Sequence, residues 1–148
     1  MKITIGSDHG AVELKETIKQ VLAELDGIEC KDVGTFTTES VDYPDIAEKV
    51  CADVVSGRAD RGIVLCGTGI GISMAANKIK GIRAALCGDV YSARKSREHN
   101  DANVLAMGGR VIGSGLAGEI VRAWVTTEFA GGRHARRVGK VMALEAKK

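Results

Sequence analysis

A cysteine followed directly by a glycine-rich loop is the part of this sequence with the clearest chemical potential. Gly62–Cys66 is a short apolar run with β-branched residues, which is typical of a strand buried on both faces. The loop Gly67–Gly71 holds three glycines, which permit positive φ angles and the close approach of another molecule. Residues 72–78 can form a helix, and the free N–H groups of a first helical turn attract an anion or a developing negative charge. A thiol at this strand end would form a thiolate more easily than free cysteine does. The alternative is a small buried cysteine before a tight turn.

The loop does not match the common nucleotide-binding motifs. A dinucleotide site needs Gly-x-Gly-x-x-Gly and a Walker A loop ends in Gly-Lys-Ser/Thr, whereas residues 67–71 read Gly-Thr-Gly-Ile-Gly. A thiol-based phosphatase needs an arginine six residues after its cysteine, and position 72 is Ile. The sequence therefore predicts a site for a small anion without a nucleotide signature.

Other polar residues could act on the same anionic substrate. Asp8-His9 follows the first predicted strand, where such a pair does acid–base work or binds phosphate; an aspartate that caps a helix is the alternative. Arg133 and Arg137 lie four residues apart at the start of the last predicted helix and could hold one phosphate together. Cations at a helix N-terminus oppose the macrodipole, which makes a bound anion a reason for them; a solvated basic face is the alternative. His99 ends a predicted helix, where a histidine usually acts as a capping cation.

Composition predicts one globular domain, residues 1–148, and argues against several other classes. A net charge of +2 and 3% aromatic residues do not favour a nucleic-acid partner. The four cysteines form no Cys-x-x-Cys pair, which argues against a zinc site or a thioredoxin-like redox site. Three of them lie in apolar contexts, as small core residues do, which predicts a reduced, cytoplasmic protein. The three histidines lack the spacing of a metal site, so we expect no metal. No stretch reads as a signal peptide or a membrane span.

Short apolar runs alternate with amphipathic segments along the whole chain. We predict strands at residues 2–6, 28–33, 62–66, 82–87 and 104–107. The segments between and after them have apolar residues at helical spacing, and the last, basic helix runs from residue 133 to about residue 146. In two of these helices, Tyr91 is expected to pack inward and Leu116 to lie on the buried face. The strand connections are too long for hairpins, which predicts right-handed βαβ units and an α/β fold of three α/β/α layers around a parallel sheet.

In such a sheet, ligands bind beyond the carboxyl ends of the strands. We therefore expect several polar and glycine-rich segments to gather at one edge of this sheet. They are Asp8-His9, Cys66–Gly71, Asp89 and Gly108-Gly109-Arg110.

Several separated motifs, in order along nearly the whole chain, resemble the type B ribose-5-phosphate isomerases. That family includes allose-6-phosphate isomerases and the subunits of galactose-6-phosphate isomerase. The motifs are Ser7-Asp8-His9-Gly10, Asp42-Tyr43-Pro44, Cys66–Ser73, Ala75-Ala76-Asn77-Lys78, Ser96–Asn103 and Gly131-Gly132-Arg133-His134. The resemblance implies a five-stranded parallel, Rossmann-like sheet, a homodimer or homotetramer with shared active sites, and no cofactor.

The resemblance also implies an activity and residue roles. The activity is aldose–ketose exchange between ribose 5-phosphate and ribulose 5-phosphate through an enediolate, a step of the pentose phosphate pathway. Cys66 resembles the base that moves the proton between C1 and C2. Some relatives use a glutamate in the loop instead, but position 73 here is Ser. His99 resembles the acid that opens the sugar ring, supplied by a neighbouring subunit with Asn100, and Arg110 is a further candidate from that subunit.

The remaining implied roles concern the substrate. His9, Arg133 and Arg137 resemble phosphate ligands, Asp8 contacts the sugar oxygens, and Thr68 lies close to the reacting oxygens. The glycine loop resembles the anion hole for the enediolate. The other implied substrate-binding positions are Tyr43, Gly67, Gly69, Ile70, Gly71 and Ser73.

Two alternatives stay open at this point. The substrate could be a hexose 6-phosphate, because the sequence does not measure the distance from the thiol to the arginines. A non-catalytic sugar-phosphate sensor could use the same fold. Such a sensor would bind without turnover and would not need a thiol beside the anion loop.

Overall fold

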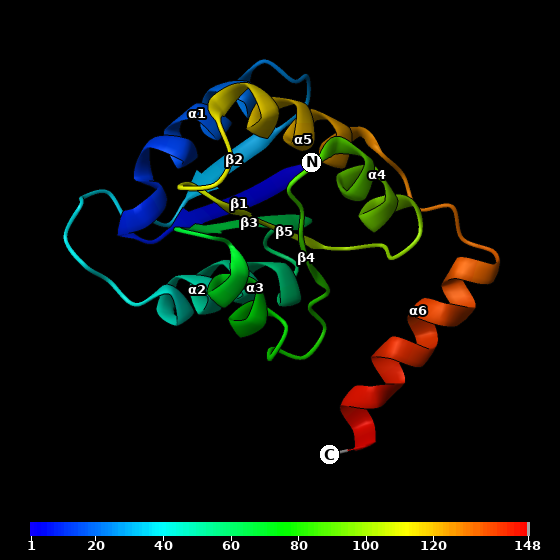
Figure 1. Ribbon diagram of the computed structural model, residues 1–148. Helices are drawn as coiled ribbons and strands as arrows, with labels where there is room; N and C mark the ends of the chain where they lie inside the picture. Colours follow the sequence, from blue (N-terminus) through cyan, green and yellow to red (C-terminus); the bar gives the residue numbers. More distant parts are fainter. Residues whose placement is uncertain (148) are drawn as a thin grey trace.

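The protein is built on one five-stranded parallel sheet with the strand order β2-β1-β3-β5-β4 (Figure 1). The computed structural model describes residues 1–147. Every neighbouring pair of strands is parallel, as predicted. The strands are β1 (Lys2–Ser7), β2 (Glu29–Asp32), β3 (Arg61–Cys66), β4 (Ala84–Leu86) and β5 (Val104–Gly108).

Helices cover both faces of the sheet, so the predicted three-layer arrangement is confirmed (Figure 1). All six residues of the central strand β3 are buried, and its side chains alternate between two apolar cores. Ile63 and Leu65 pack toward α1, α4 and α5, whereas Val64 and Cys66 pack toward α2 and α3. The bounds of these helices are α1 (Val12–Ala23), α2 (Tyr43–Val55), α3 (Ile70–Ala76), α4 (Val90–Glu98) and α5 (Ser114–Thr126).

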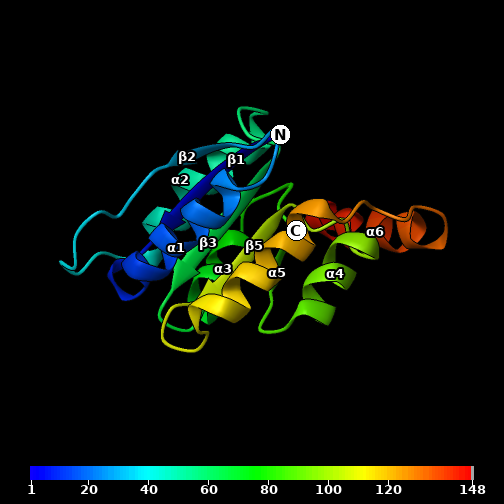
Figure 2. The same ribbon diagram turned by 90° about the horizontal axis from the view of Figure 1, so that it is seen from above.

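The last helix, α6 (Arg133–Ala143), stands apart from the two layers and extends away from the sheet (Figures 1 and 2). It buries no residue. The turn that follows it is tied to the body by a hydrogen bond from the Gly81 N–H to Glu145 Oε1, at 2.9 Å. A groove of about 460 Å³ separates α6 from the body and is lined by apolar side chains that include Ile82, Val138 and Val141.

Some details differ from the sequence-based expectations. Tyr91 is 68% exposed and Leu116 is 43% exposed, so neither packs inward as predicted. Both lie in the first turn of a helix, Tyr91 in α4 and Leu116 in α5. The fourth strand covers residues 84–86 only. The α-helical part of the last segment ends at Ala143 and continues as a short 3₁₀ turn, Leu144–Lys147.

The strand ends form two opposite borders of the parallel sheet, and different residues lie at each. The register pairs Gly62 with Val104 at one end of the β3–β5 ladder and Cys66 with Gly108 at the other. We call the end at Cys66 the carboxyl edge and the end at Gly62 the amino edge. Four residues of strand separate them by about 13 Å.

Candidate active site

Cys66 is the last residue of β3 and points toward the start of α3. It is 5% exposed. Its Sγ accepts a hydrogen bond from the Gly69 N–H at 3.1 Å. An N–H group aimed at sulfur stabilises negative charge there, so the loop geometry suits a thiolate that accepts a proton.

The glycines of the loop are required by close backbone packing. Gly69 has φ +79°, and a Cβ at this position would lie 2.7 Å from the backbone carbon of Met107. A Cβ at Gly108 would lie 2.5 Å from the Thr68 backbone. A side chain at either position would push the loop away from the end of β5. Glycine at both positions therefore lets the loop pack directly against β5.

The loop offers backbone donors next to the sulfur. The N–H groups of Gly67, Thr68 and Gly71 donate to no acceptor within residues 1–147, whereas the Ile70 N–H donates to Thr68 Oγ1 at 3.1 Å. Ser73 is buried and its hydroxyl donates to the Ile70 carbonyl at 2.7 Å. Ser73 therefore braces the first turn of α3, while the free N–H groups can hold an oxyanion.

Asp8 and His9 lie at the same edge, directly after β1. The Asp8 N–H donates to the Leu65 carbonyl at 3.0 Å, which joins this turn to the residue before Cys66. Asp8 is 7% exposed and its Oδ1 accepts from the Gly10 N–H at 2.9 Å, so it caps the short 3₁₀ helix His9–Ala11. The cap uses one carboxylate oxygen. His9 Nδ1 accepts from the Val41 N–H at 3.2 Å.

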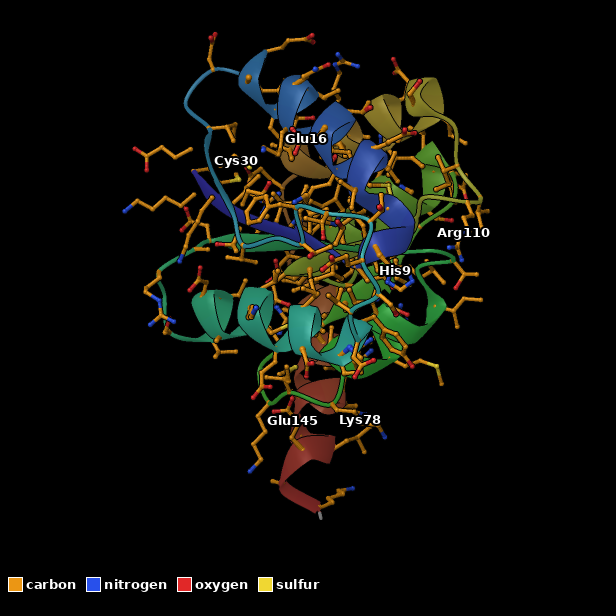
Figure 3. All side chains as sticks on the ribbon, turned by 90° about the vertical axis from the view of Figure 1, so that its left-hand side faces the viewer. His9, Glu16, Cys30, Lys78, Arg110 and Glu145 are labelled. Atoms are coloured by element: carbon orange, nitrogen blue, oxygen red, sulfur yellow. The ribbon has the colours of Figure 1, made fainter. Side chains whose placement is uncertain are left out.

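Two more predicted residues border the glycine loop. A Cβ at Gly67 would lie 3.1 Å from Arg110 Nη1, and the Arg110 N–H donates to the Gly67 carbonyl. Arg110 thus lies at the carboxyl edge of its own chain, and Figure 3, which looks at this edge, labels it on the same side of the molecule as His9. Tyr43 packs on Gly71, where a Cβ would lie 2.7 Å from the phenol ring.

The remaining predicted residues lie elsewhere. His99 is the C-cap of α4 and precedes β5, so it lies at the amino edge of the sheet. Its ring stacks on His134 with centroids 4.1 Å apart and planes 8° from parallel. Asn100 and Arg137 both line the groove beside α6. Arg133 begins α6, four residues and one helical turn before Arg137.

His134 was not among the predicted site residues. Burial and then the charges of His99, Arg133 and Arg137 lower the pKa of its imidazole below the ordinary value. Its place directly after Arg133 in the sequence is the signal that could have pointed to it. The amino-edge group is therefore a cluster of two stacked imidazoles and two guanidinium groups, which favours a bound anion.

The chain is similar to known sugar-phosphate isomerases over its whole length. The profile of the ribose/galactose isomerase family matches residues 3–141. The chain belongs to this family. Ribose-5-phosphate isomerase B of Escherichia coli is 49% identical over 147 residues, which cover 99% of this chain and 98% of that one. The structure of ribose-5-phosphate isomerase B from Clostridium thermocellum matches with a TM-score of 0.96 at 59% identity and covers 99% of both chains. The D-erythrulose-4-phosphate isomerase of Pectobacterium atrosepticum is 46% identical over 142 residues, covering 95% and 93%.

The predicted site residues thus divide between the two edges. The carboxyl edge brings together Asp8, His9, Tyr43, Cys66, Arg110 and the glycine loop. The amino edge holds His99, Asn100, Arg133 and Arg137. No cluster of three or more His, Cys, Asp or Glu side chains within residues 1–147 could hold a metal ion. In the same residues, no helix is long and apolar enough to cross a membrane.

Proposed function

We propose that this chain interconverts ribose 5-phosphate and ribulose 5-phosphate. The observation that carries the proposal is a buried cysteine beside a glycine loop with free N–H donors, in a chain 49% identical to a ribose-5-phosphate isomerase B over nearly its full length. Aldose–ketose exchange needs a base beside a carbon acid, an oxyanion site and a group that opens the ring. It needs no redox partner, because one carbon is oxidised while its neighbour is reduced.

Cys66 is the base in this proposal. Its thiolate takes the proton from C2 of the open-chain aldose, which leaves an enediolate, and the same proton or one from water is returned to C1. The negative charge develops on the sugar oxygen, where the N–H groups of Gly67, Thr68 and Gly71 can stabilise it. The free oxygen of Asp8 and the hydroxyl of Thr68 lie at the same edge and can carry the oxygen-bound proton.

Ring opening and phosphate binding require a second copy of the chain. His99 lies at the amino edge, about 13 Å or more from Cys66 along the sheet, so it cannot reach a sugar held at the carboxyl edge of its own subunit. Arg133 and Arg137 lie on α6, which projects from the rest of the chain (Figure 2). In the proposal, His99, Asn100 and the two arginines of one subunit complete the carboxyl-edge site of its neighbour in a homodimer or homotetramer.

The length of the substrate is the open part of the proposal. One relative is named for a four-carbon sugar phosphate, and the alternatives from the sequence are the six-carbon allose and galactose 6-phosphates. Initial rates on ribose 5-phosphate, D-erythrulose 4-phosphate, allose 6-phosphate and galactose 6-phosphate decide among them. We expect the highest kcat/KM with ribose 5-phosphate.

The reaction type has its own test in deuterium oxide. A proton removed by Cys66 exchanges with solvent, so deuterium should enter C1 of the ribulose 5-phosphate that is formed. A non-catalytic sugar-phosphate sensor would bind the same sugar without turnover and without exchange. Binding without either signal would overturn the isomerase proposal.

The cysteines bear on the cellular compartment of the protein. Residues 1–148 are proposed to act as one domain in the cytoplasm, because the free thiols of all four cysteines suit a reducing compartment.

A further inference from the structure

A fully buried lysine contacts a segment that is hydrogen-bonded to Ser7 and His9 at the carboxyl edge. Lys15, on α1, is 0% exposed and is among the largest fully buried side chains of the protein. Lysine is almost never buried unless its charge is paired, because an ammonium group loses much hydration energy when it leaves water. The partners of Lys15 therefore indicate what the buried charge is holding.

The partners of Lys15 lie at the end of β2 and just beyond it. Its Nζ donates to Asp32 Oδ1 at 2.8 Å and to the Thr35 carbonyl at 2.6 Å, and it lies 4.4 Å from the centroid of the Phe36 ring. Asp32 Oδ1 also accepts from the Gly34 N–H at 2.8 Å. Burial alone would raise the pKa of Asp32, but hydrogen bonds from Lys15, Gly34 and Lys19 hold it below its ordinary value. One ion pair thus fixes the start of the segment that follows β2.

That segment, residues 33–41, is attached to the site at both ends. At its start, the Ser7 N–H donates to the Gly34 carbonyl at 2.7 Å and the Thr35 N–H donates to the Ser7 carbonyl at 2.6 Å. Ser7 directly precedes Asp8-His9. At its end, the Val41 N–H donates to His9 Nδ1 at 3.2 Å. The residues between these attachments, 36–40, are exposed, so the two ends determine how the segment lies.

The hydrogen bond from Val41 determines which nitrogen of His9 can donate. A neutral imidazole has one protonated nitrogen, so a ring that accepts at Nδ1 carries its proton on Nε2. We propose that Lys15 and Asp32 are positioning residues for His9. Their buried ion pair holds segment 33–41 so that the Val41 N–H fixes His9 with Nε2–H as the donor to the phosphate of the substrate. The part played by phosphate rests on the proposed function.

The decisive experiment compares two lysines that bind the same carboxylate. Lys15→Met removes the buried charge at similar length. Lys19→Met is the matched control, because Lys19 donates to the other oxygen, Asp32 Oδ2, and to Glu16, and to no acceptor in residues 33–41. Nitrogen-15 NMR at about pH 9, where histidine side chains are neutral, reads the tautomer of His9 directly. With three histidines in the chain, His9→Gln assigns its signals.

We expect the wild type and Lys19→Met to show the Nε2–H form of His9, and Lys15→Met to show a mixture of both forms. The KM for ribose 5-phosphate should rise in Lys15→Met by the inverse of the fraction of His9 that keeps the Nε2–H form, about twofold for an equal mixture, while kcat stays near the wild-type value. In a His9→Gln background, Lys15→Met should cause no further rise in KM. An unchanged tautomer in Lys15→Met, or an additional loss in the His9→Gln background, would overturn the assignment.

Two further measurements separate other causes of failure. If Lys15→Met does not fold, Asp32→Asn keeps the shape of the side chain and removes the charge that orients Lys15; the same NMR and KM outcomes then decide. If the wild-type protein binds ribose 5-phosphate without turnover, the proposed function fails. The tautomer comparison still decides whether Lys15 positions His9, because it needs no substrate.

Discussion

At the carboxyl edge of the sheet, the candidate residues are fixed by backbone hydrogen bonds and close glycine packing. Cys66 is buried, its sulfur accepts from the Gly69 N–H, and Asp8 is bonded through its backbone to Leu65. At the amino edge, by contrast, Arg133 and Arg137 lie exposed on a helix that buries no residue. The first group is preorganised for chemistry by its own chain. Within residues 1–147, neither arginine of the second group forms an ion pair, which is the arrangement expected of a group that completes a site elsewhere.

The largest loss of activity should follow from replacing Cys66, the proposed base at the carboxyl edge. Cys66→Ala removes the proposed base and should lower kcat by about 10²–10⁴-fold, while KM and the circular dichroism spectrum stay near those of the wild type. Cys51→Ala is the control, because Cys51 is also buried and burial raises the pKa of its thiol to about 12, so it stays a neutral core residue. A Cys66→Ala enzyme within threefold of the wild-type rate would remove this thiol from the mechanism.

A mixing experiment tests whether the two edges belong to one active site. Cys66→Ala subunits lack the carboxyl-edge base and His99→Asn subunits lack the amino-edge acid, so each homodimer should be inactive. If sites form between subunits, a mixed dimer has one intact site. After random exchange of equal amounts, about a quarter of the wild-type activity should return.

The control for this experiment mixes Cys66→Ala with His9→Gln. Both changes then lie at the carboxyl edge. In a dimer that pairs one carboxyl edge with one amino edge, no intact site can form and activity should not return. Equal recovery in both mixtures, or none in the first after exchange is verified by mass spectrometry, would contradict a site shared between the two edges.

A comparison of two arginines of α6 tests whether the amino edge binds the phosphate of the substrate. Arg137 lines the groove with Asn100 and lies one turn after Arg133, whereas Arg136 is rotated about the helix axis by about 100° from Arg137 and about 60° from Arg133. Arg137→Ala should raise the KM for ribose 5-phosphate by about tenfold or more, the loss of one charge-assisted hydrogen bond. Arg136→Ala should change KM by less than about twofold. Equal losses would mean that α6 presents a diffuse basic surface rather than a paired phosphate site.

Most of the carboxyl edge could be predicted because its signals are local. Apolar runs predict the strands, and glycines after Cys66 predict a loop that must pack closely, which Gly69 and Gly108 do. The rule that parallel strands end at one edge then collects Asp8 and Arg110 beside the loop. These inferences need no knowledge of the strand order.

The rest depends on how elements pack, which local patterns do not record. Helical spacing predicted that Tyr91 and Leu116 would be buried, but both are exposed. The spacing identifies which face of a helix is apolar, and it does not record how much of that face a neighbouring element covers. Nothing in the sequence indicated that Lys15 is buried, since a lysine in an amphipathic helix is normally expected to face solvent. The separation of His99 from Cys66 follows from topology alone: a helix that returns from the carboxyl edge must end at the amino edge.

The smallest expected effect is a shift in the titration of His134, and it reports directly on whether the amino-edge cluster binds an anion. In the free protein, burial and the neighbouring charges of His99, Arg133 and Arg137 lower the pKa of His134, because they disfavour a further positive charge. A sulfate ion held by the two arginines adds negative charge beside the ring, so it should raise that pKa toward or above the ordinary value. By linkage, sulfate should bind more tightly as the pH falls through the titration range of His134. Sulfate stays a dianion over this range, so its own protonation does not contribute.

NMR titrations of His134 with and without sulfate measure the shift, and Arg137→Ala should abolish most of the sulfate effect while raising the pKa of His134 in the free protein. The same midpoint with and without saturating sulfate would mean that the anion does not bind beside His134, and the amino edge would lose its proposed role in holding phosphate.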